Sequence, residues 1–444
     1  MKPNAVITRF PPSPTGYFHI GSARTALFNY LFAKHAGGKI FLRFEDTDTE
    51  RSKKEFEDDI LSGLDWLGLA LDRGAFLRQS ERTGVYRTHL TGLIEQGVAY
   101  EAEESTVSPG MKVVRFRNPK KTVTFHDVIR GDVSFDTAEL GDFIIARTHD
   151  LPLYHLAVVV DDAETGVTHI IRGEDHISNT QRQILLIEAF GFARPQYAHI
   201  PLILAPDKAK LSKRHGAVSI HEYRAQGFIP EALINYLALL GWNPGLPAQA
   251  GGKERELYTL EELVGEFSLE RVHKSGAVFD IEKLTWFNHE YLRRLPDAEF
   301  KKRLEEFAHI TIDGRLVPLL KERSRTLKEA ADALAAGEYR FLTVSVFPDK
   351  ELLLKAAQAD ADAVKKHLKK VGELLAPLAD GEFGAAAVRD AVFPYATQQG
   401  RAAVLWPLRV ALSGAEKSPD PFTLAALLGK NTTLSRIGDA LRVL

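Results

Sequence analysis

Apolar and polar positions follow a repeating order in the N-terminal part of the chain, from Ala5 to about Pro206. Short apolar runs such as Ala5 to Phe10 and Ile40 to Phe44 are typical of buried strands. Between these two runs, apolar side chains recur three and four residues apart from Ala23 to Leu31, which indicates a helix. Strands that alternate with helices predict a parallel sheet with helical crossovers.

The pattern changes between Tyr100 and Tyr154. Short alternating segments there, such as Val113 to Phe116 and Thr122 to Phe125, are separated by prolines and glycines. This alternation predicts an inserted, mainly antiparallel subdomain. Apolar runs that are expected to complete the parallel sheet follow over Leu156 to Val160, Thr168 to Arg172 and His199 to Leu204.

Helical patterns dominate beyond about Leu295, where the strand patterns fade. Alanine, leucine and lysine are frequent there, for example over Leu327 to Leu334 and Val364 to Leu375, and these residues favour helices. The C-terminal third is therefore expected to form a helical domain. The stretch Pro244 to Gly252 has the composition of a surface loop.

Composition supports a protein of several domains and excludes several kinds of chemistry. The chain has 444 residues, 45% of them hydrophobic and 26% charged, which predicts a soluble globular protein of several domains. A net charge of −2 neither supports nor excludes RNA binding. The absence of cysteine excludes disulfides, thiolate catalysis and cysteine-bound zinc. Without an apolar run of membrane-spanning length or a secretion leader, the chain is expected to be cytoplasmic, with no membrane partner.

The loop after the first strand is the first candidate for chemistry. It runs from Phe10 through three prolines and one glycine to His19 and Gly21 at the start of the predicted helix. Free backbone N–H groups and the helix dipole favour anions at such a position, which predicts a phosphate site. Taken alone, such a loop is more often only a rigid turn.

A second basic element lies about two hundred residues further along, at Lys208, Lys210, Lys213 and Arg214. Cations on a loop that also contains serine and glycine suit closure on a triphosphate, where they would neutralise charge during nucleotidyl transfer. Taken alone, it is more often a solvated charged loop.

Together the two elements resemble the signature motifs of class I aminoacyl-tRNA synthetases, which are usually called HIGH and KMSKS. Here the motifs read His19-Ile20-Gly21-Ser22 and Lys210-Leu211-Ser212-Lys213-Arg214. Ser22 in place of histidine and Arg214 in place of serine are typical of the glutamyl branch. The glutaminyl relatives typically carry Glu and Asn where this chain has Ser13 and Thr15, which also favours glutamate.

The resemblance to bacterial glutamyl-tRNA synthetases extends over almost the whole chain. Further matching blocks are Thr8 to Gly16, Leu42 to Asp48, His169 to Thr180, Phe279 to Leu284 and Pro407 to Gly414. The resemblance implies a multidomain α/β plus α fold: a Rossmann-type parallel-sheet catalytic domain, an inserted acceptor-binding subdomain and a C-terminal all-helical anticodon-binding domain. The expected segments are residues 1–99 and 155–205 for the catalytic domain, 100–154 for a shortened acceptor-end insertion, 206–295 for the KMSKS loop and stem-contact domain, and 296–444 for the anticodon-binding domain.

A pocket for free glutamate needs an acid for its ammonium group and cationic or hydroxyl donors for its two carboxylates. The resemblance assigns the side-chain carboxylate to Arg9 and Tyr154. It assigns the α-amino group to Glu45 and the α-carboxylate to Arg172, and Ser13 joins the glutamate-binding set. The alternative for each residue alone is a surface ion pair with a neighbour such as Asp46 or Glu174.

The resemblance also implies ATP with Mg²⁺ as cosubstrate and His19, Lys210 and Lys213 as the catalytic residues that stabilise phosphate charge. The expected ATP-binding residues are Pro12, Thr15, Gly16, His19, Gly21, Lys213 and Arg214. Activation of glutamate as its adenylate is then followed by transfer to the 3′-terminal ribose of tRNA-Glu.

The implied partners are L-glutamate and tRNA-Glu, and the chain is expected to act as a monomer. Basic residues of the insertion can grip the acceptor end of the RNA through phosphates, although a solvated strand face is an equal alternative. These residues are Lys112, Arg115, Arg117, Lys120 and Lys121. Lysines and arginines of the C-terminal helices, Lys365, Lys366, Lys369, Lys370, Arg436 and Arg442, suit an anticodon-binding role. No zinc is expected, because only a short segment separates Tyr100 from Val113 and cysteine is absent.

Alternative functions stay open at this point. One is an enzyme that charges tRNA-Gln as well as tRNA-Glu. Another is a relative that modifies a queuosine-type anticodon base, but such relatives lack the C-terminal helical domain. The last is an inactive RNA-binding paralogue, which the intact motif residues disfavour.

Overall fold

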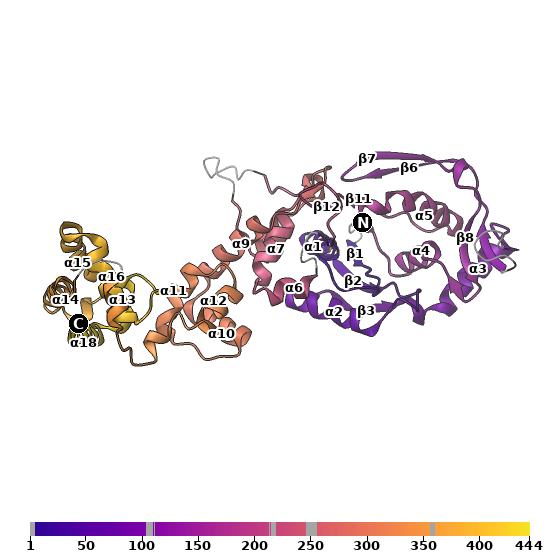
Figure 1. The fold of residues 1–444 in the computed structure, drawn as a ribbon. Helices are drawn as coiled ribbons and strands as arrows, with labels where there is room; N and C mark the ends of the chain where they lie inside the picture. The colour runs from indigo at the N-terminus through magenta and orange to yellow at the C-terminus, as the bar shows by residue number, and fades with distance from the viewer. Residues whose placement is uncertain are drawn as a thin grey trace. The chain divides into compact units, whose positions relative to one another are not determined.

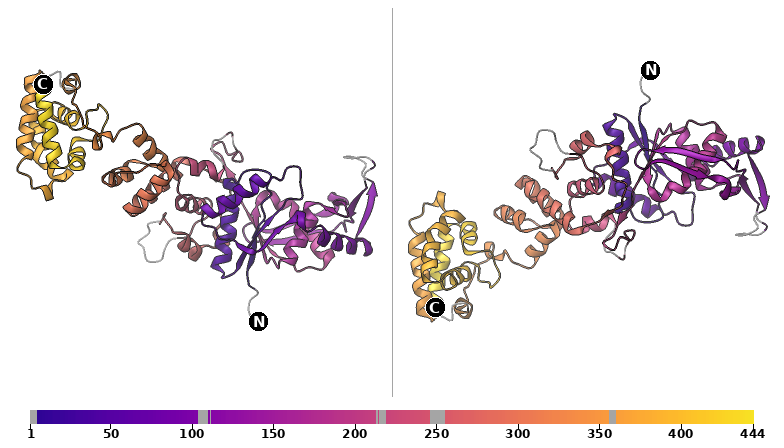
Figure 2. Two further views of the ribbon diagram at one scale, coloured as in Figure 1. Left: turned by 90° about the horizontal axis from the view of Figure 1, so that it is seen from below. Right: turned by 90° about the horizontal axis from the view of Figure 1, so that it is seen from above.

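The computed structural model describes residues 5–103, 110, 112–212, 214, 219–245, 255–355 and 360–444. The chain divides into two units, Met1–Leu292 and Arg293–Leu444. The strands lie in the first unit, drawn indigo to magenta, whereas the second unit, drawn orange to yellow, is helical (Figure 1, Figure 2).

Parallel strands form the centre of the first unit. One three-stranded sheet has the order β1 (Ile7–Phe10), β2 (Lys39–Phe44) and β3 (Asp72–Arg78), and β10 (His169–Gly173) pairs in parallel with β11 (Gln196–Ile200). The two groups meet where the backbone N–H of Thr168 donates to the Ile7 carbonyl oxygen at 2.9 Å. The crossover helices are α1 (Ile20–His35), α2 (Lys54–Trp66) and α5 (Ile177–Phe190). The predicted Rossmann-type parallel sheet is confirmed.

The inserted segment is mainly antiparallel, as its alternation predicted. Helix α3 (Thr83–Glu95) leads into a sheet of four strands, β4 (Ala99–Glu103), β5 (Lys112–Phe116), β8 (Phe143–Thr148) and β9 (Leu151–Pro152). Strand β6 (Thr122–Asp127) forms a hairpin with β7 (Gly131–Asp136). This hairpin extends the catalytic sheet, because Asp127 of β6 pairs with Tyr197 of β11 (Figure 1).

One predicted strand is wrong. Leu156 to Val160 lies in helix α4 (Tyr154–Glu164), and all five residues are buried. The helix packs against α3, α5 and strand β8, so apolar partners surround it and it shows no polar stripe over these residues. Periodicity alone cannot separate such a buried helix segment from a buried strand. The correction matters for the site, because α4 carries Tyr154 in its first turn and Asp162 near its end.

The remainder of the first unit contains the second motif and packs against helix α1, which begins at the first motif. Strand β12 (Ile203–Leu204) pairs in parallel with β13 (Ala277–Val278) just before Lys210. The helices that follow are α6 (Ile220–Ala225), α7 (Pro230–Leu239), α8 (Leu260–Glu266) and α9 (Ile281–Arg294), and α1 packs against α7 and α8. Residues 246–252 of the expected surface loop lie outside the described residues.

The second unit consists of helices, as predicted for this part of the chain. They are α10 (Asp297–Ala308), α11 (Val317–Arg323), α12 (Leu327–Ala335), α13 (Lys350–Leu354), α14 (Ala361–Leu375), α15 (Ala385–Gln399), α16 (Arg401–Ser413), α17 (Pro421–Leu428) and α18 (Lys430–Val443). Lys366, Lys369 and Lys370 are exposed on α14. Arg436 is buried instead, and its guanidinium donates to the carbonyl oxygens of Leu412 and Phe341, so it is tied to the backbone of its own unit.

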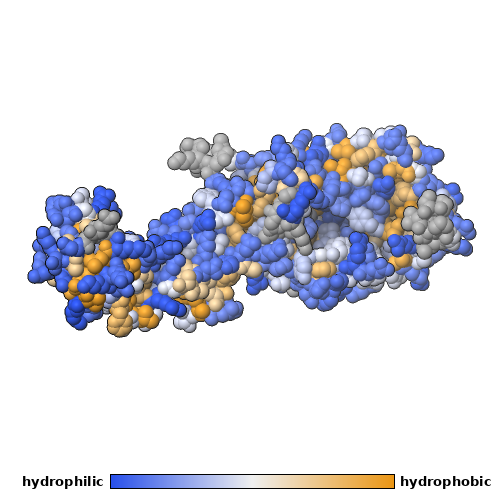
Figure 3. Space-filling view, viewed as in Figure 1, coloured by the Kyte–Doolittle hydropathy of each residue, from blue (hydrophilic) through white to orange (hydrophobic). Residues whose placement is uncertain are grey.

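The surface in Figure 3 is mainly hydrophilic on the face shown. Within the part of the chain that the structure describes, none of the helices has the length and apolar character needed to cross a membrane.

Candidate active site

A cavity of about 410 Å³ opens in the first unit beside the carboxyl ends of β1 and β10. This edge is where open α/β sheets bind ligands. Residues from distant segments of the chain meet around it, and the expected site residues that line it are Arg9, Pro12, Ser13, His19, Gly21, Glu45, Tyr154, Arg172 and Lys210.

Four expected ATP-site residues are not placed on this cavity. Thr15 and Arg214 are exposed, and neither they nor Gly16 belong to the described lining. Lys213 lies outside the described residues, so its expected role stays a prediction.

The basic residues of the insertion lie away from the cavity lining, and most of them are exposed. Lys121 pairs with Glu188 at 2.6 Å between Nζ and Oε2, and the Arg117 guanidinium lies 4.3 Å from the centre of the Tyr100 ring. Lys112 and Lys120 are exposed, and Arg115 is half-buried with its Nη1 donating to the Asp142 carbonyl oxygen. Their expected contact with RNA stays a prediction.

The first motif forms the N-terminus of α1. His19 is the N-cap residue, and its Nδ1 accepts a hydrogen bond from the Ser22 backbone N–H at 3.2 Å. Nδ1 is therefore the unprotonated nitrogen of the neutral ring, and Nε2 carries the proton. A Cβ at Gly21 would lie 3.1 Å from the His19 ring, so glycine leaves room for the imidazole in this position. The free N–H groups of the first helical turn remain available to an anion.

The two motifs meet although about 190 residues separate them. The backbone of Ile220, just beyond the second motif, donates to the Phe18 carbonyl oxygen at 2.8 Å. Lys210 lines the same cavity as His19 and forms an ion pair with Asp175 at 3.1 Å. The surrounding protein lowers the pKa of His19, and the charge of Lys210 lowers it further. Both effects keep the imidazole neutral near pH 7.

On the β1 side of the cavity, the charged groups compensate one another. Arg9 is buried, and its Nε donates to both carboxylate oxygens of Asp162 at 3.2 and 3.3 Å. Arg43 donates to Asp162 at 2.6 Å through Nη1 and to Glu45 at 3.1 Å through Nη2. Burial raises the pKa of Glu45, while Arg43 and Arg9 oppose this shift. Nη1 of Arg9 is buried, and no hydrogen-bond partner for it is found among the described residues.

On the β10 side, neutral groups hold the second arginine. Arg172 donates through Nε to His199 at 3.1 Å, through Nη1 to Gln183 at 2.8 Å and through Nη2 to Thr180 at 2.7 Å. His199 Nε2 must accept this bond, so its proton is on Nδ1, which donates to Asp127 at 2.6 Å. Burial lowers the pKa of Arg172.

Tyr154 completes the pocket from the first turn of α4. Its hydroxyl lies 3.2 Å from Nδ1 of His176. Burial raises the pKa of Tyr154, with Glu45 as the next cause, so the phenol keeps its proton and is a neutral donor.

The alternative of surface ion pairs does not describe the two arginines. Arg9 and Arg172 are both buried, and their partners are the groups named above. Asp46 accepts instead from the backbone N–H of Ser80 at 2.8 Å, and Glu174 pairs with Arg130.

Sequence reasoning missed the residues that hold these side chains. They are Arg43, Asp162, Thr180, Gln183 and His199. Two signals could have revealed the first pair: an arginine inside the apolar strand Lys39–Phe44, and the two acids, Asp161 and Asp162, that follow the apolar run of α4. Buried charges are rare without a partner, so both predicted an ion pair.

A metal-binding cluster is not found among the residues that the structure describes: no group of three or more His, Asp or Glu side chains there could hold an ion. The cavity thus offers cations, neutral donors and the two carboxylates of Glu45 and Asp175, which suits anionic ligands that carry an ammonium group.

Family models match both parts of the chain. The catalytic domain of the class I tRNA synthetases (E and Q) matches residues 5–108 and 101–286, and the anticodon binding domain matches residues 270–441. Together with the parallel sheet and its two motifs, these matches define an ATP-using aminoacyl-tRNA ligase of class I.

Full-length relatives narrow this class. The chain is 40% identical to the glutamate–tRNA ligase of Nitratidesulfovibrio vulgaris (strain Hildenborough), with 98% of this chain and 99% of the relative covered. It is 39% identical to glutamate–tRNA ligase 1 of Caldanaerobacter subterraneus subsp. tengcongensis, with 98% of each covered. A crystal structure of a glutamate tRNA ligase from Elizabethkingia meningosepticum, in complex with its amino acid, matches with a TM-score of 0.82 and 31% identity over 99% of this chain and 100% of that one. The chain belongs to the glutamate–tRNA ligase family.

Proposed function

We propose that the cavity binds L-glutamate and ATP together, and that the chain converts them to glutamyl-adenylate before it esterifies the 3′-terminal ribose of tRNA-Glu. The observation that carries this proposal is that one cavity is lined by His19 and Gly21 of the first motif, by Lys210 of the second and by all the expected glutamate-binding residues. Family membership supports the same reaction.

Glutamate is recognised by charge and by hydrogen-bond donors. Arg9 and Tyr154 receive the side-chain carboxylate, and Ser13 belongs to the same pocket. Glu45 binds the α-amino group, and Arg172 addresses the α-carboxylate. Nη1 of Arg9 supports this assignment. It is buried and has no hydrogen-bond partner among the described residues, and a buried guanidinium nitrogen needs an acceptor, which the glutamate carboxylate would supply.

Activation joins glutamate to the nucleotide without a covalent enzyme intermediate. An α-carboxylate oxygen of glutamate attacks the α-phosphorus of ATP, which enters as its magnesium complex, and the bond to the β-phosphate oxygen breaks to release pyrophosphate. His19, Lys210 and Lys213 stabilise the negative charge that develops on the phosphates, while the remaining proposed ATP contacts are Pro12, Thr15, Gly16, Gly21 and Arg214. Catalysis is mainly positioning and electrostatic stabilisation.

Transfer to RNA uses the remaining parts of the chain. The ribose hydroxyl attacks the carbonyl carbon of the mixed anhydride, an ester forms and AMP leaves. The insertion over residues 100–154 receives the acceptor end, with Lys112, Arg115, Arg117, Lys120 and Lys121 near the phosphates. Residues 206–295 contact the stem, and residues 296–444 read the anticodon of tRNA-Glu. The chain acts in the cytoplasm as a monomer.

An assay of ATP–pyrophosphate exchange, run with and without tRNA, tests the reaction. Exchange that depends on glutamate supports the proposal. Its absence under both conditions overturns the proposal in favour of the inactive RNA-binding paralogue. Charging of purified tRNA-Glu and tRNA-Gln in parallel separates a strict enzyme from one that also charges tRNA-Gln.

Two further assays test the remaining parts. Anticodon substitutions in tRNA-Glu should weaken charging by the full chain, whereas charging that ignores the anticodon leaves the helical unit without its proposed role.

No zinc takes part in this proposal, so activity should survive a zinc-selective chelator when magnesium is in excess. Activity that is lost and then restored by added zinc contradicts it.

A further inference from the structure

Asp162 contacts the arginine pair that supports the β1 side of the cavity. Its carboxylate is 7% exposed and receives Nε of Arg9 and Nη1 of Arg43. Arg9 lines the cavity, whereas Asp162 lies behind that wall, near the end of α4. The carboxylate is therefore placed to hold another residue that touches substrate, and not to touch substrate itself.

Arg43 connects Asp162 to Glu45, which is the only acid of the proposed glutamate-binding set. Its planar guanidinium donates to Asp162 and to Glu45 through two different nitrogens. Arg43 is 2% exposed, so no solvent competes for these bonds. One buried carboxylate thereby fixes Arg9 directly and Glu45 through a single intervening side chain. These two residues are proposed to bind opposite ends of the same glutamate.

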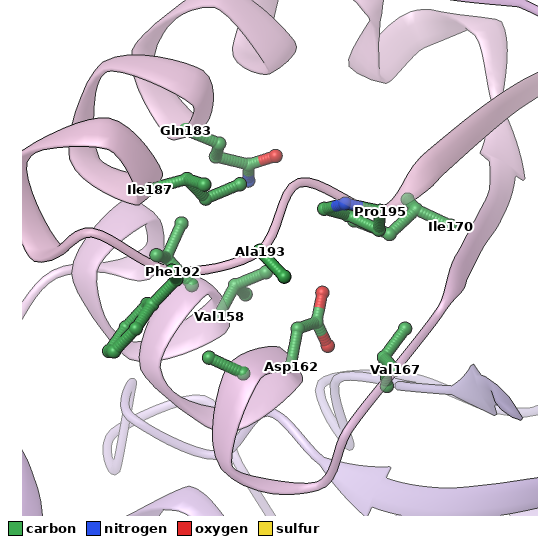
Figure 4. A pocket seen from close by; sticks show the side chains of 11 residues that line it. Val158, Asp162, Val167, Ile170, Gln183, Ile187, Phe192, Ala193 and Pro195 are labelled. Atoms are coloured by element: carbon green, nitrogen blue, oxygen red, sulfur yellow. The ribbon is translucent and has the colours of Figure 1, made fainter. Parts of the chain in front are cut away.

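Asp162 also lines a second cavity, which Figure 4 shows; its lining is mostly apolar, and the Gln183 amide is the other polar group on it. This second cavity measures about 20 Å³, room for about one water molecule. Its apolar lining includes Val158, Val167, Ile170, Ile187 and Phe192. The Asp162 side chain is only 7% exposed, and Arg9 and Arg43 are its charged hydrogen-bond partners. In such surroundings an ion pair holds its geometry more firmly than at the surface.

We propose that Asp162 is a positioning residue for glutamate recognition: it holds Arg9 and, through Arg43, Glu45 in the geometry that fits the substrate. This inference rests on the proposed function of the cavity. Nothing in it requires Asp162 to contact glutamate or ATP.

Charge and positioning predict opposite effects at this residue. Replacing Asp162 by asparagine leaves the β1 side one unit more positive, so an effect of net charge alone would tighten the binding of anionic glutamate. Loss of positioning weakens binding instead, because Arg9 and Arg43 lose their shared partner and turn toward other acceptors. The sign of the change therefore separates the two roles.

The test compares Asp162→Asn with Asp161→Asn in the full-length chain. Asp161 is a matched control because it is the adjacent, fully buried acid of α4, and its hydrogen-bond donors Gln79, Arg82 and Tyr86 do not line the cavity. Asp161 also forms a longer ion pair with Arg43, 3.8 Å between Oδ2 and Nε, so the control keeps a comparable buried charge near Arg43 but removes none of the hydrogen bonds that hold Arg9 or Glu45. Glutamate affinity is measured by calorimetry, and KM and kcat by ATP–pyrophosphate exchange.

Asp162→Asn is expected to raise the Kd and KM for glutamate by about 30-fold or more, since small displacements of positioned groups cost up to about 100-fold. The kcat and the KM for ATP should change by less than about 5-fold, and Asp161→Asn should leave the KM for glutamate within about 3-fold of wild type. An unchanged or lower KM in Asp162→Asn overturns the assignment, and so does an equal rise in both variants.

Arg43→Lys keeps the proposal testable if Asp162→Asn does not fold. Lysine retains the charge but cannot span Asp162 and Glu45 with a planar fork, so the KM for glutamate should rise by about 10-fold while kcat is retained. A wild-type KM in Arg43→Lys contradicts the assignment. The proposed function fails separately, because a wild-type chain that neither binds nor activates glutamate overturns both proposals.

Discussion

The two sides of the cavity hold their arginines in opposite ways. On the β1 side, Arg9 pairs with the carboxylate of Asp162. On the β10 side, Arg172 is held by an imidazole, an amide and a hydroxyl, and none of these three groups carries a negative charge. Arg9 thus pairs directly with a carboxylate before substrate arrives, whereas Arg172 reaches a carboxylate, that of Asp127, only through His199.

Histidines on the β10 side strengthen the contrast. His155 and His176 both have a pKa lowered to about 4, first by burial, and the charge of Arg172 lowers both further. They stay neutral near pH 7, so Arg172 keeps the only full charge among these groups. The β1 wall therefore concentrates its support in a single carboxylate, whereas the β10 wall distributes the support of Arg172 over several neutral partners.

The largest effect is expected at Arg172, because none of its hydrogen-bond partners in the described part of the chain is acidic. Arg172→Leu should lower kcat/KM for glutamate by about three powers of ten, the scale of a lost buried ion pair. Arg172→Lys is the matched control, since it keeps the charge and loses the fork, and it should retain part of the activity. Steady-state exchange kinetics measure both. Equal kcat/KM for wild type and Arg172→Leu would remove Arg172 from the pocket.

A smaller loss of glutamate use is expected for Arg9→Leu, because Asp162 already offsets part of the Arg9 charge. The variant should lose about two powers of ten in kcat/KM for glutamate, and with it the preference for glutamate over glutamine. Glutamine has nearly the same shape but presents N–H donors, which a guanidinium cannot accept.

Activation of both amino acids by wild type and Arg9→Leu is the measurement. A variant that still prefers glutamate by the wild-type ratio would show that Arg9 does not contact the distal carboxylate. A larger loss in Arg9→Leu than in Arg172→Leu would reverse the comparison between the two walls.

The same contrast explains what the sequence could and could not reveal. Arg9, Glu45 and Arg172 stand in ordered blocks beside strand ends, and the order of strands and helices places them at one edge of the sheet. His199 and Thr180 offered no such signal, because histidine and threonine are common in buried strands and helices without any ligand. The role of His199 depends on the register of β10 against β11, which sets Arg172 opposite His199, whereas Thr180 reaches Arg172 from helix α5.

The helix α4 shows a different limit. Its continuous apolar run, Leu156 to Val160, predicts a strand, and the two acids that follow it do not change that prediction. Asp162 reaches Arg9 only because this segment is a helix that ends behind β1. The incorrect strand prediction for this segment therefore hides Asp162 as the partner of Arg9, although Arg9 itself is predicted to be a site residue.

The neutral state of His155 predicts a moderate effect of pH on stability. Its pKa is about 4 in the folded chain and about 6.5 when unfolded. Between these values only the unfolded chain takes up the proton, so the free energy of unfolding falls as pH falls from 6.5 to 4. The contribution is on the order of 2 kcal/mol at pH 4.5.

Denaturant unfolding of wild type and His155→Gln at pH 7 and 4.5 measures this contribution. The difference between the two pH values should be smaller in His155→Gln by about 2 kcal/mol. Equal differences would mean that His155 takes up its proton in the folded chain, which would place a second cation beside Arg172 and weaken the contrast between the walls.

The smallest effect is expected at Thr180, and it tests whether the support of Arg172 is truly distributed. The Thr180 hydroxyl accepts from Arg172 Nη2 at 2.7 Å and is fully buried, and valine has nearly the same shape without the acceptor. A hydrogen bond to a charged group contributes about 1.5–3 kcal/mol, but His199 and Gln183 still hold the other two nitrogens. Thr180→Val should therefore raise the KM for glutamate by only about 5- to 10-fold, less than Asp162→Asn, with kcat retained. Thr180→Ser keeps the hydroxyl and should remain near wild type in the same exchange assay. A rise in Thr180→Val as large as in Asp162→Asn would show that the β10 wall, like the β1 wall, depends on a single partner.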